Sequence, residues 1–117
     1  MSRSLQLYLE DILQACAKVQ RYTINMTFEQ FITDERTYDA VARNLLIIGE
    51  SVKNIPQPIR DCNPEIEWRK IAGLRDILAH AYFQIEDEII WDIVQHKIHP
   101  LQQHIQQLME TEVNHDE

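Results

Sequence analysis

Apolar residues recur at steps of three and four along the chain, the spacing that gives an α-helix one buried face. The clearest stripe comprises Tyr38, Val41, Leu45, Ile48, Val52 and Ile55. Similar stripes predict helices over residues 5–22, from Ile66 to between His80 and Phe83, over 86–98 and after Pro100. Strand-like alternation is scarce, and two glycines and four prolines leave little material for hairpin turns. We therefore predict an all-α fold, a four- to five-helix up-and-down bundle.

Polar residues and prolines mark the ends of the predicted helices. Thr27 and Gln30 have the spacing of a capping box, which predicts a short helical turn. Thr33 or Asp34 can cap the second long helix. Prolines near both ends of residues 56–65 indicate a linker with room for one turn, because proline cannot continue a helix.

Other residues are expected to shape the packing. Gly49 lies beside the apolar stripe of the second long helix, where a missing side chain lets another helix approach, at a cost of about 1 kcal/mol relative to Ala. The acids at 86–88 suit the positive end of a helix dipole. Pro100 is expected to open or kink the last helix. Trp68 and Trp91 are predicted to anchor the core or an interface.

The length of 117 residues suits one hydrophobic core. We predict one helical domain over 1–112, followed by a frayed acidic tail over 113–117. Cys16 and Cys62 have no CxxC pattern around them, which favours a reduced, cytoplasmic protein. No signal peptide is expected, and the longest apolar run, 45–48, is too short to cross a membrane.

The net charge of −8 argues against sequence-blind binding to DNA, because proteins that grip phosphates are usually basic. The distribution of charge changes this picture. Residues 68–85 contain three positive charges and one negative charge, whereas residues 86–117 contain one positive and eight negative charges. The first of these segments therefore either meets an anion or forms a solvated helix face.

The positive segment contains Arg75, Asp76 and His80 on one predicted helix. Arg75 and His80 are separated by about 140° of rotation and about 7.5 Å of rise, so Arg75 can flank a cleft beside His80. Asp76 stands about one turn before His80, so its carboxylate can orient the imidazole and favour its protonated form. Arginine and histidine are a minimal set for RNA cleavage, because the ribose 2′-hydroxyl is the nucleophile. His80 would move protons and Arg75 would hold the phosphate.

The spacing alone leaves other interpretations open. Arg75 and His80 could instead have a structural role, in which their side chains form hydrogen bonds with polar groups at helix ends and on neighbouring residues. Tyr82 could contact the phosphate, stack on a base or lie at the edge of the core. Arg69 and Lys70 are candidate RNA contacts, and plain solvation explains them as well.

The run from residue 75 to 82, Arg-Asp-Ile-Leu-Ala-His-Ala-Tyr, is similar to the Arg-x4-His-x-Tyr motif of HepT-like HEPN proteins. The flanking text at 39–50, 64–74, 82–83 and 90–91 resembles the same family. The likeness extends from about residue 3 to 109, nearly the whole chain. The resemblance therefore implies a HEPN helical domain.

This resemblance implies a homodimer in which two Arg75/His80 pairs face each other across a composite cleft; pairing into a higher assembly stays open. It implies a metal-independent endoribonuclease without a cofactor, which cuts tRNA or mRNA and leaves a cyclic phosphate. HepT proteins resemble toxins paired with MntA, a minimal nucleotidyltransferase antitoxin. The antitoxin transfers AMP from ATP to the motif tyrosine, here Tyr82, and the added charge would block RNA.

Asp76 stands where many HEPN motifs have Asn, so its negative charge brings the affinity for RNA into question. Together with the net charge, Asp76 favours an alternative function, a HEPN dimer that binds a nucleotidyltransferase and cuts nothing. The intact pair of Arg75 and His80 favours the nuclease, because a scaffold has no need of both.

Other polar residues have weaker claims to a function. The histidines at 96, 99 and 104 have one good acidic partner, Asp92, so a solvated helix face is favoured over a metal site. Arg43 and Glu50 lie on the second long helix and are candidate supports of the cleft.

Overall fold

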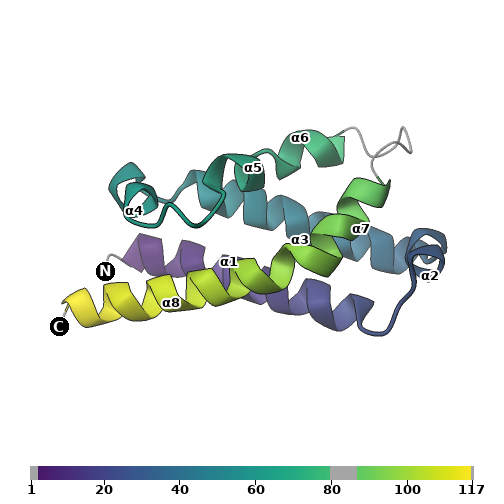
Figure 1. The fold of residues 1–117 in the computed structure, drawn as a ribbon, viewed down its shortest axis with the longest axis horizontal. Helices are drawn as coiled ribbons and strands as arrows, with labels where there is room; N and C mark the ends of the chain where they lie inside the picture. Colours follow the sequence, from purple (N-terminus) through teal and green to yellow (C-terminus); the bar gives the residue numbers. More distant parts are fainter. Residues whose placement is uncertain (1–2, 80–86, 117) are drawn as a thin grey trace.

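The computed structural model describes residues 3–79 and 87–116. Within these ranges every regular element is an α-helix, which confirms the predicted all-α class (Figure 1). The elements are α1 (Arg3–Thr23), α2 (Phe28–Thr33), α3 (Glu35–Lys53), α4 (Gln57–Asp61), α5 (Trp68–Ala72), α6 (Leu74–Ala79), α7 (Asp87–His96) and α8 (Ile98–Asp116).

The chain runs back and forth along the long axis of the molecule. Helix α1 leads to the end where α2 lies, and α3 returns beside it (Figure 1). Helices α5 and α6 follow α3 in the opposite direction, and α7 and α8 bring the chain back along α1. This antiparallel course agrees with the predicted up-and-down arrangement.

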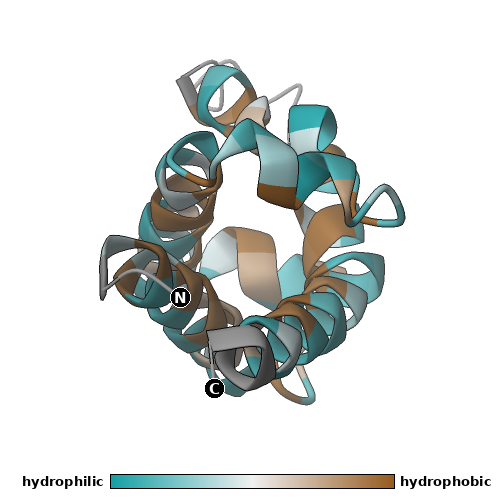
Figure 2. Cartoon of the chain, turned by 90° about the vertical axis from the view of Figure 1, so that its left-hand side faces the viewer, coloured by the Kyte–Doolittle hydropathy of each residue, from teal (hydrophilic) through white to brown (hydrophobic). Residues whose placement is uncertain are grey.

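The core lies between the apolar faces of α1, α3 and α8, which point toward one another in the end-on view (Figure 2). The buried side chains of these helices include Leu9, Ile12, Val19, Val41, Leu45, Ile48, Val52, Leu101, Ile105 and Leu108. Burial of apolar surface of this kind is the main force that holds helices together, at about 25 cal/mol per Å². The predicted stripe of the second long helix is thus confirmed as its buried face.

Two helix starts follow the predicted capping chemistry. The amide of Gln30 donates to the Thr27 hydroxyl at 3.1 Å, and the amide of Thr27 donates to the Gln30 side chain at 2.9 Å, a complete capping box. Asp34, rather than Thr33, caps α3 by accepting from the amide of Thr37 at 3.1 Å. This bond, first among several, lowers the pKa of Asp34.

The prediction of one continuous helix after Ile66 was wrong, because the structure divides this segment into α5 and α6 at Gly73. The Gly73 amide donates to the Arg69 carbonyl at 3.0 Å and closes the last turn of α5. Glycine is a weak helix former, so an interruption costs little there. Arg75 therefore lies on a short helix of its own, α6, rather than on the helix that bears Arg69 and Lys70.

The last helix, α8, extends through Asp116. The frayed acidic tail over 113–117 stays a prediction. Residues 102–117 contain no glycine or proline, so nothing in the chain stops the helix there. Pro100 lies in the first turn of α8 and opens it, as one of the two predicted alternatives had it.

Trp68 fastens the 56–65 linker to the start of α5. Its side chain is buried, and its indole N–H donates to the carbonyls of Arg60 at 3.2 Å and Asn63 at 3.0 Å. The prediction that Trp68 anchors the core is confirmed. The linker itself includes the short helix α4, in agreement with the single turn expected there.

The two cysteines are free and lie in different environments. Burial raises the pKa of the Cys16 thiol to about 12, whereas Cys62 is exposed. Among the described helices, none combines the length and the apolar character that crossing a membrane requires.

Candidate functional site

Gly49 permits the close approach between α3 and the segment that bears the candidate residues. A Cβ atom at Gly49 would stand 3.3 Å from the carbonyl oxygen of Ile71 and 3.6 Å from the Cβ of Leu74. Any larger side chain would push the backbone of α5 away from α3. The predicted role of Gly49 is confirmed, and the contact places α6 beside the middle of α3.

Arg75 extends from α6 toward α3 and forms an ion pair there. Its Nη1 atom lies 3.0 Å from Oε1 of Glu50, and Nζ of Lys53 lies 4.0 Å from the same oxygen. That oxygen is shielded from solvent and accepts no hydrogen bond from the described residues, so its contact with Arg75 is an ion pair without hydrogen-bond geometry. The side chains of Glu50 and Arg75 are 45% and 58% exposed overall. Glu50 therefore contacts the candidate arginine, and its role as a support of the cleft stays a prediction.

Asp76 is exposed in the first turn of α6, directly beside Arg75 in the chain. Its expected contact with His80 cannot be placed, because His80 and Tyr82 lie outside the described residues. The structure thus positions the arginine of the predicted motif and its acidic neighbour. The general acid–base role of His80 and the modification of Tyr82 stay predictions.

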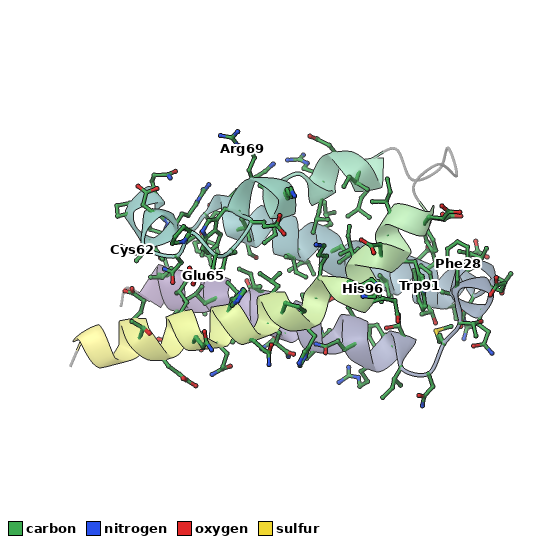
Figure 3. All side chains as sticks on the ribbon, in the orientation of Figure 1. Phe28, Cys62, Glu65, Arg69, Trp91 and His96 are labelled. Atoms are coloured by element: carbon green, nitrogen blue, oxygen red, sulfur yellow. The ribbon has the colours of Figure 1, made fainter. Side chains whose placement is uncertain are left out.

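Arg69 and Lys70, the candidate RNA contacts on α5, are in different situations. Arg69 is exposed and points away from the bundle (Figure 3). Lys70 forms an ion pair with Glu67 at 2.8 Å. The hydrogen bond between them, with their charge attraction second, raises the pKa of Lys70 and lowers the pKa of Glu67. Arg69 is thus the better placed of the two for a phosphate.

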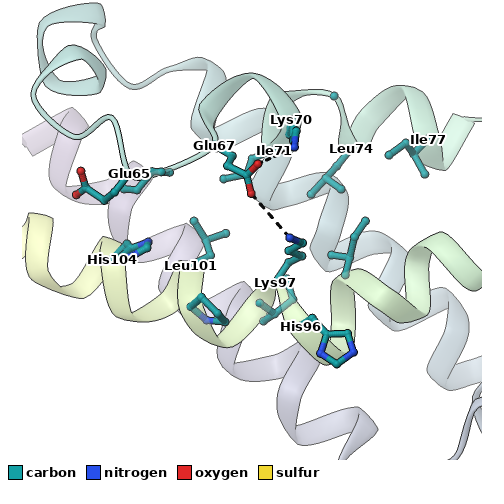
Figure 4. Close-up of a pocket in the computed structure, with 15 residues that line it drawn as sticks. Glu65, Glu67, Lys70, Ile71, Leu74, Ile77, His96, Lys97, Leu101 and His104 are labelled. Atoms are coloured by element: carbon teal, nitrogen blue, oxygen red, sulfur yellow. Dashed lines mark ion pairs between the residues drawn. The ribbon is translucent and has the colours of Figure 1, made fainter.

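An apolar groove of about 570 Å³ lies between α5–α6 and α7–α8 (Figure 4). Its lining includes Ile66, Ile71, Leu74, Ile77, Ile93 and Leu101. Lys97 stands across it from Glu67, with 4.0 Å between the Lys97 Nζ and Glu67 Oε1 atoms. The walls are mainly apolar, although Lys70, Lys97 and His104 also line the groove, and Arg75 is not among its lining residues.

The N-terminus of α7 is fixed to α3 by a contact that the sequence analysis missed. The hydroxyl of Tyr38 donates to Oδ1 of Asp87 at 2.6 Å. Phe31 stacks on the Tyr38 ring and packs against Trp91, with ring centroids 5.1 and 5.0 Å apart. The acid at 87 does start α7, as predicted, but no sequence signal links two residues 49 positions apart.

His96 and His99 are exposed, whereas His104 is partly buried and lines the apolar groove. The Nε2 atom of His96 is 4.0 Å from Oδ1 of Asp92, the partner that the sequence identified. His99 contacts the side-chain oxygen of Gln20 on α1 at 3.2 Å. Across the described part of the chain, no three His, Cys, Asp or Glu side chains gather closely enough for a metal site. Arg43 is exposed on α3.

A family model described as "Ribonuclease HepT-like" matches residues 12–108. The chain belongs to the HepT-like ribonuclease family. This membership confirms the resemblance inferred from the motif around Arg75. The match includes α3, α5, α6 and α7 in full, so both partners of the Glu50–Arg75 ion pair lie within it.

Individual relatives agree with this HepT-like assignment. A protein of Thermococcus cleftensis named "Probable ribonuclease HepT" is 44% identical over 98 residues, 84% of this chain and 89% of the relative. A protein of Methanocaldococcus jannaschii whose name proposes an RNase activity is 43% identical over 96 residues, 82% of this chain and 79% of the relative. No solved structure matches the chain.

Proposed function

We propose that this HepT-like protein is a metal-independent endoribonuclease, the toxin of a toxin–antitoxin pair. The observation that supports this most directly is the motif Arg75-x4-His80-x-Tyr82 in a chain of the HepT-like ribonuclease family. The exposed guanidinium of Arg75 supports it further, because a phosphate can reach that group.

The proposed reaction needs no nucleophile from the protein. The ribose 2′-oxygen attacks the adjacent phosphorus, the bond from phosphorus to the 5′-oxygen breaks, and a 2′,3′-cyclic phosphate remains. His80 takes the proton of the 2′-hydroxyl or gives one to the leaving oxygen. Arg75 donates hydrogen bonds to the phosphate and stabilises the charge that develops on it. Asp76 orients His80, and Arg69 and Lys70 guide the RNA backbone.

The proposed site is completed by a second copy of the chain. Two Arg75/His80 pairs face each other across a two-fold axis, so the positive charge of residues 68–85 is doubled at the cleft. This arrangement reconciles RNA binding with the net charge of −8, because the acidic residues of the last helices can lie away from the cleft. The substrate is tRNA or mRNA.

We propose that a minimal nucleotidyltransferase of the MntA kind is the antitoxin. The phenolic oxygen of Tyr82 attacks the α-phosphorus of ATP, pyrophosphate leaves, and AMP remains on the tyrosine. The added phosphate, two residues from His80, excludes RNA by occupancy and by charge repulsion.

Cleavage of labelled tRNA and mRNA in EDTA tests the proposal, with intact mass measured on the same preparation. Unmodified protein is expected to cut, and His80→Ala and Arg75→Ala proteins that remain folded dimers are expected to cut at least about a hundredfold more slowly. Arg36→Ala, which removes an exposed arginine of α3, is the matched control. Cleavage that survives either motif substitution would refute the assignment of the site.

A second function is favoured by one observation. Glu50 places one carboxylate 3.0 Å from Arg75, and Asp76 follows Arg75 directly in the chain. These negative charges weaken the attraction for phosphate and suit a dimer that binds a nucleotidyltransferase without cutting RNA. Unmodified parent protein that leaves both RNAs intact would establish this alternative. A mass increase of one AMP in a silent preparation would instead indicate a neutralised toxin.

A further inference from the structure

We propose that Glu50 is a positioning residue, which holds the guanidinium of Arg75 in the orientation that receives the scissile phosphate. The inference rests on the proposed nuclease function and adds to it a residue of α3, outside the Arg75–Tyr82 motif. Its basis is the 3.0 Å contact between Arg75 Nη1 and Glu50 Oε1.

Arg75 needs such a partner because its side chain is 58% exposed. An arginine on the surface has about 2 kcal/mol of rotamer entropy, which must be lost when the guanidinium binds a phosphate in one geometry. An ion pair made before RNA arrives removes part of that loss from the step in which the phosphate reaches its transition state, so it acts on the rate rather than on the binding of RNA. Glu50 can supply it, since the contacting oxygen is shielded from solvent.

The contact leaves donors for the substrate. A guanidinium has five N–H groups, and the ion pair with Glu50 is made through Nη1. Lys53 lies 4.0 Å from the same carboxylate oxygen, so the three side chains together have one net positive charge. The group therefore still attracts a phosphate, whereas an isolated Glu50–Arg75 pair would be neutral.

The location of Glu50 in the fold makes it a firm support. It follows Gly49, the residue that lets α5 and the start of α6 lie against α3. Val52 and Ile48, its neighbours along α3, are fully buried in the core. The backbone that bears the Glu50 carboxylate is thus held by one of the long core helices. Through the ion pair, the Arg75 guanidinium is positioned relative to α3 as well as to its own short helix.

Glu50→Gln tests the inference, because it removes the charge and keeps the shape. We expect the single-turnover rate on labelled tRNA in EDTA to fall about tenfold, with KM within about twofold of the parent. The melting temperature should stay unchanged, since exposed ion pairs contribute little to stability. Glu50→Asp, which keeps the charge on a shorter side chain, is expected to recover part of the rate.

Glu35→Gln is the matched control. Glu35 is exposed in the first turn of α3, the helix that also bears Glu50, and loses the same charge on substitution. It makes no ion pair with Arg75, so its rate should stay within about twofold of the parent. An equal decrease in both variants would show a general charge effect and overturn the inference, as would a Glu50→Gln protein with the parental rate.

A second readout separates this inference from the nuclease proposal. The Nε–H signal of Arg75, assigned by its absence in Arg75→Lys, is measured by ¹⁵N NMR in the parent and the Glu50→Gln protein. We expect the signal to move to the position of a solvated arginine when Glu50 is replaced. An unchanged signal overturns the inference. A parent that cuts no RNA overturns the nuclease and any role of Glu50 in catalysis, whereas a shifted signal would still show that Glu50 holds Arg75.

Discussion

Helices α1, α3 and α8 differ sharply from α5 and α6 in how they are held. The three long helices bury apolar residues along most of their turns, including Ile12, Leu45 and Ile105, which are fully buried. Helices α5 and α6 are short, pack mainly on α3, and have an apolar groove between them and α7–α8. The candidate Arg75 lies on this less buried layer.

The difference suggests that stability and substrate contact depend on different helices of one small domain. Burial in the three long helices provides stability, because apolar area removed from water is the dominant favourable contribution. In the proposed function, the layer of α5 and α6 supplies the charged groups that meet the RNA, and such groups have to stay accessible. Gly49 and Glu50, adjacent on α3, join the two layers through one backbone approach and one ion pair.

The largest effect is expected from truncation of the long-helix core. Ile12→Ala should lower the free energy of unfolding by about 2–5 kcal/mol, because it leaves a cavity at a fully buried position. Ile77→Ala, at a partly buried position on α6, should cost about 1 kcal/mol. Urea denaturation of both proteins measures the contrast. Equal losses would show that the two layers are equally packed.

Gly49→Leu should separate the layers. The added side chain meets the backbone of α5, where even a Cβ atom would stand 3.3 Å from a carbonyl oxygen. We expect a stability loss of about 1–3 kcal/mol from overpacking. RNA cleavage should fall further than this loss explains, because Arg75 moves away from Glu50. Circular dichroism and cleavage rates measure the two effects. Ala17→Leu, which adds the same side chain at an exposed position of α1, is the control and should preserve cleavage.

Tyr38→Phe probes the link between α3 and α7. The change removes a 2.6 Å hydrogen bond to the Asp87 carboxylate and keeps the aromatic stacking on Phe31. A hydrogen bond to a charged group contributes about 1.5–3 kcal/mol, and partial solvent access to Asp87 favours the lower end. Chemical denaturation compares the variant with Tyr22→Phe. Equal stabilities of Tyr38→Phe and the parent would contradict a structural role for this link.

The smallest effect concerns the Asp34 cap of α3. The Thr37 amide lowers the pKa of Asp34 below its ordinary value of 3.8, so the charged cap stabilises the folded protein above that value. This contribution disappears as the pH falls through the lowered pKa of the folded state. Urea midpoints at pH 6 and pH 3 should therefore differ less in Asp34→Asn than in the parent. Asp11→Asn, an exposed carboxylate within α1, should leave the difference unchanged.

The sequence predicted the helices well where one face is continuously buried. The stripe from Tyr38 to Ile55 and the capping box of Thr27 and Gln30 are local signals, and both are confirmed. The prediction failed at Gly73. The apolar stripe continues past this residue in the sequence, but the helix ends at Ala72 and a new helix begins at Leu74. A periodic pattern does not report a local break that costs the helix little.

The candidate site was predictable only as a set of residue types. The motif identified Arg75, and the resemblance that it supported is confirmed by the family match. The sequence analysis named Glu50 as a candidate support of the cleft but did not name the residue that it contacts. It also missed the hydrogen bond from Tyr38 to Asp87. Both contacts join residues far apart in the chain, and the spacing of residues in a sequence contains no such information.

The sequence by itself determined the all-helical class, the buried face of each long helix and the family. These follow from local periodicity, capping chemistry and a contiguous motif, in which each residue acts on near neighbours. Only the tertiary structure decided that α5 lies against Gly49 and that Arg75 pairs with Glu50. Such contacts depend on how helices approach one another, and that approach is set by the volume and shape of side chains across the whole core.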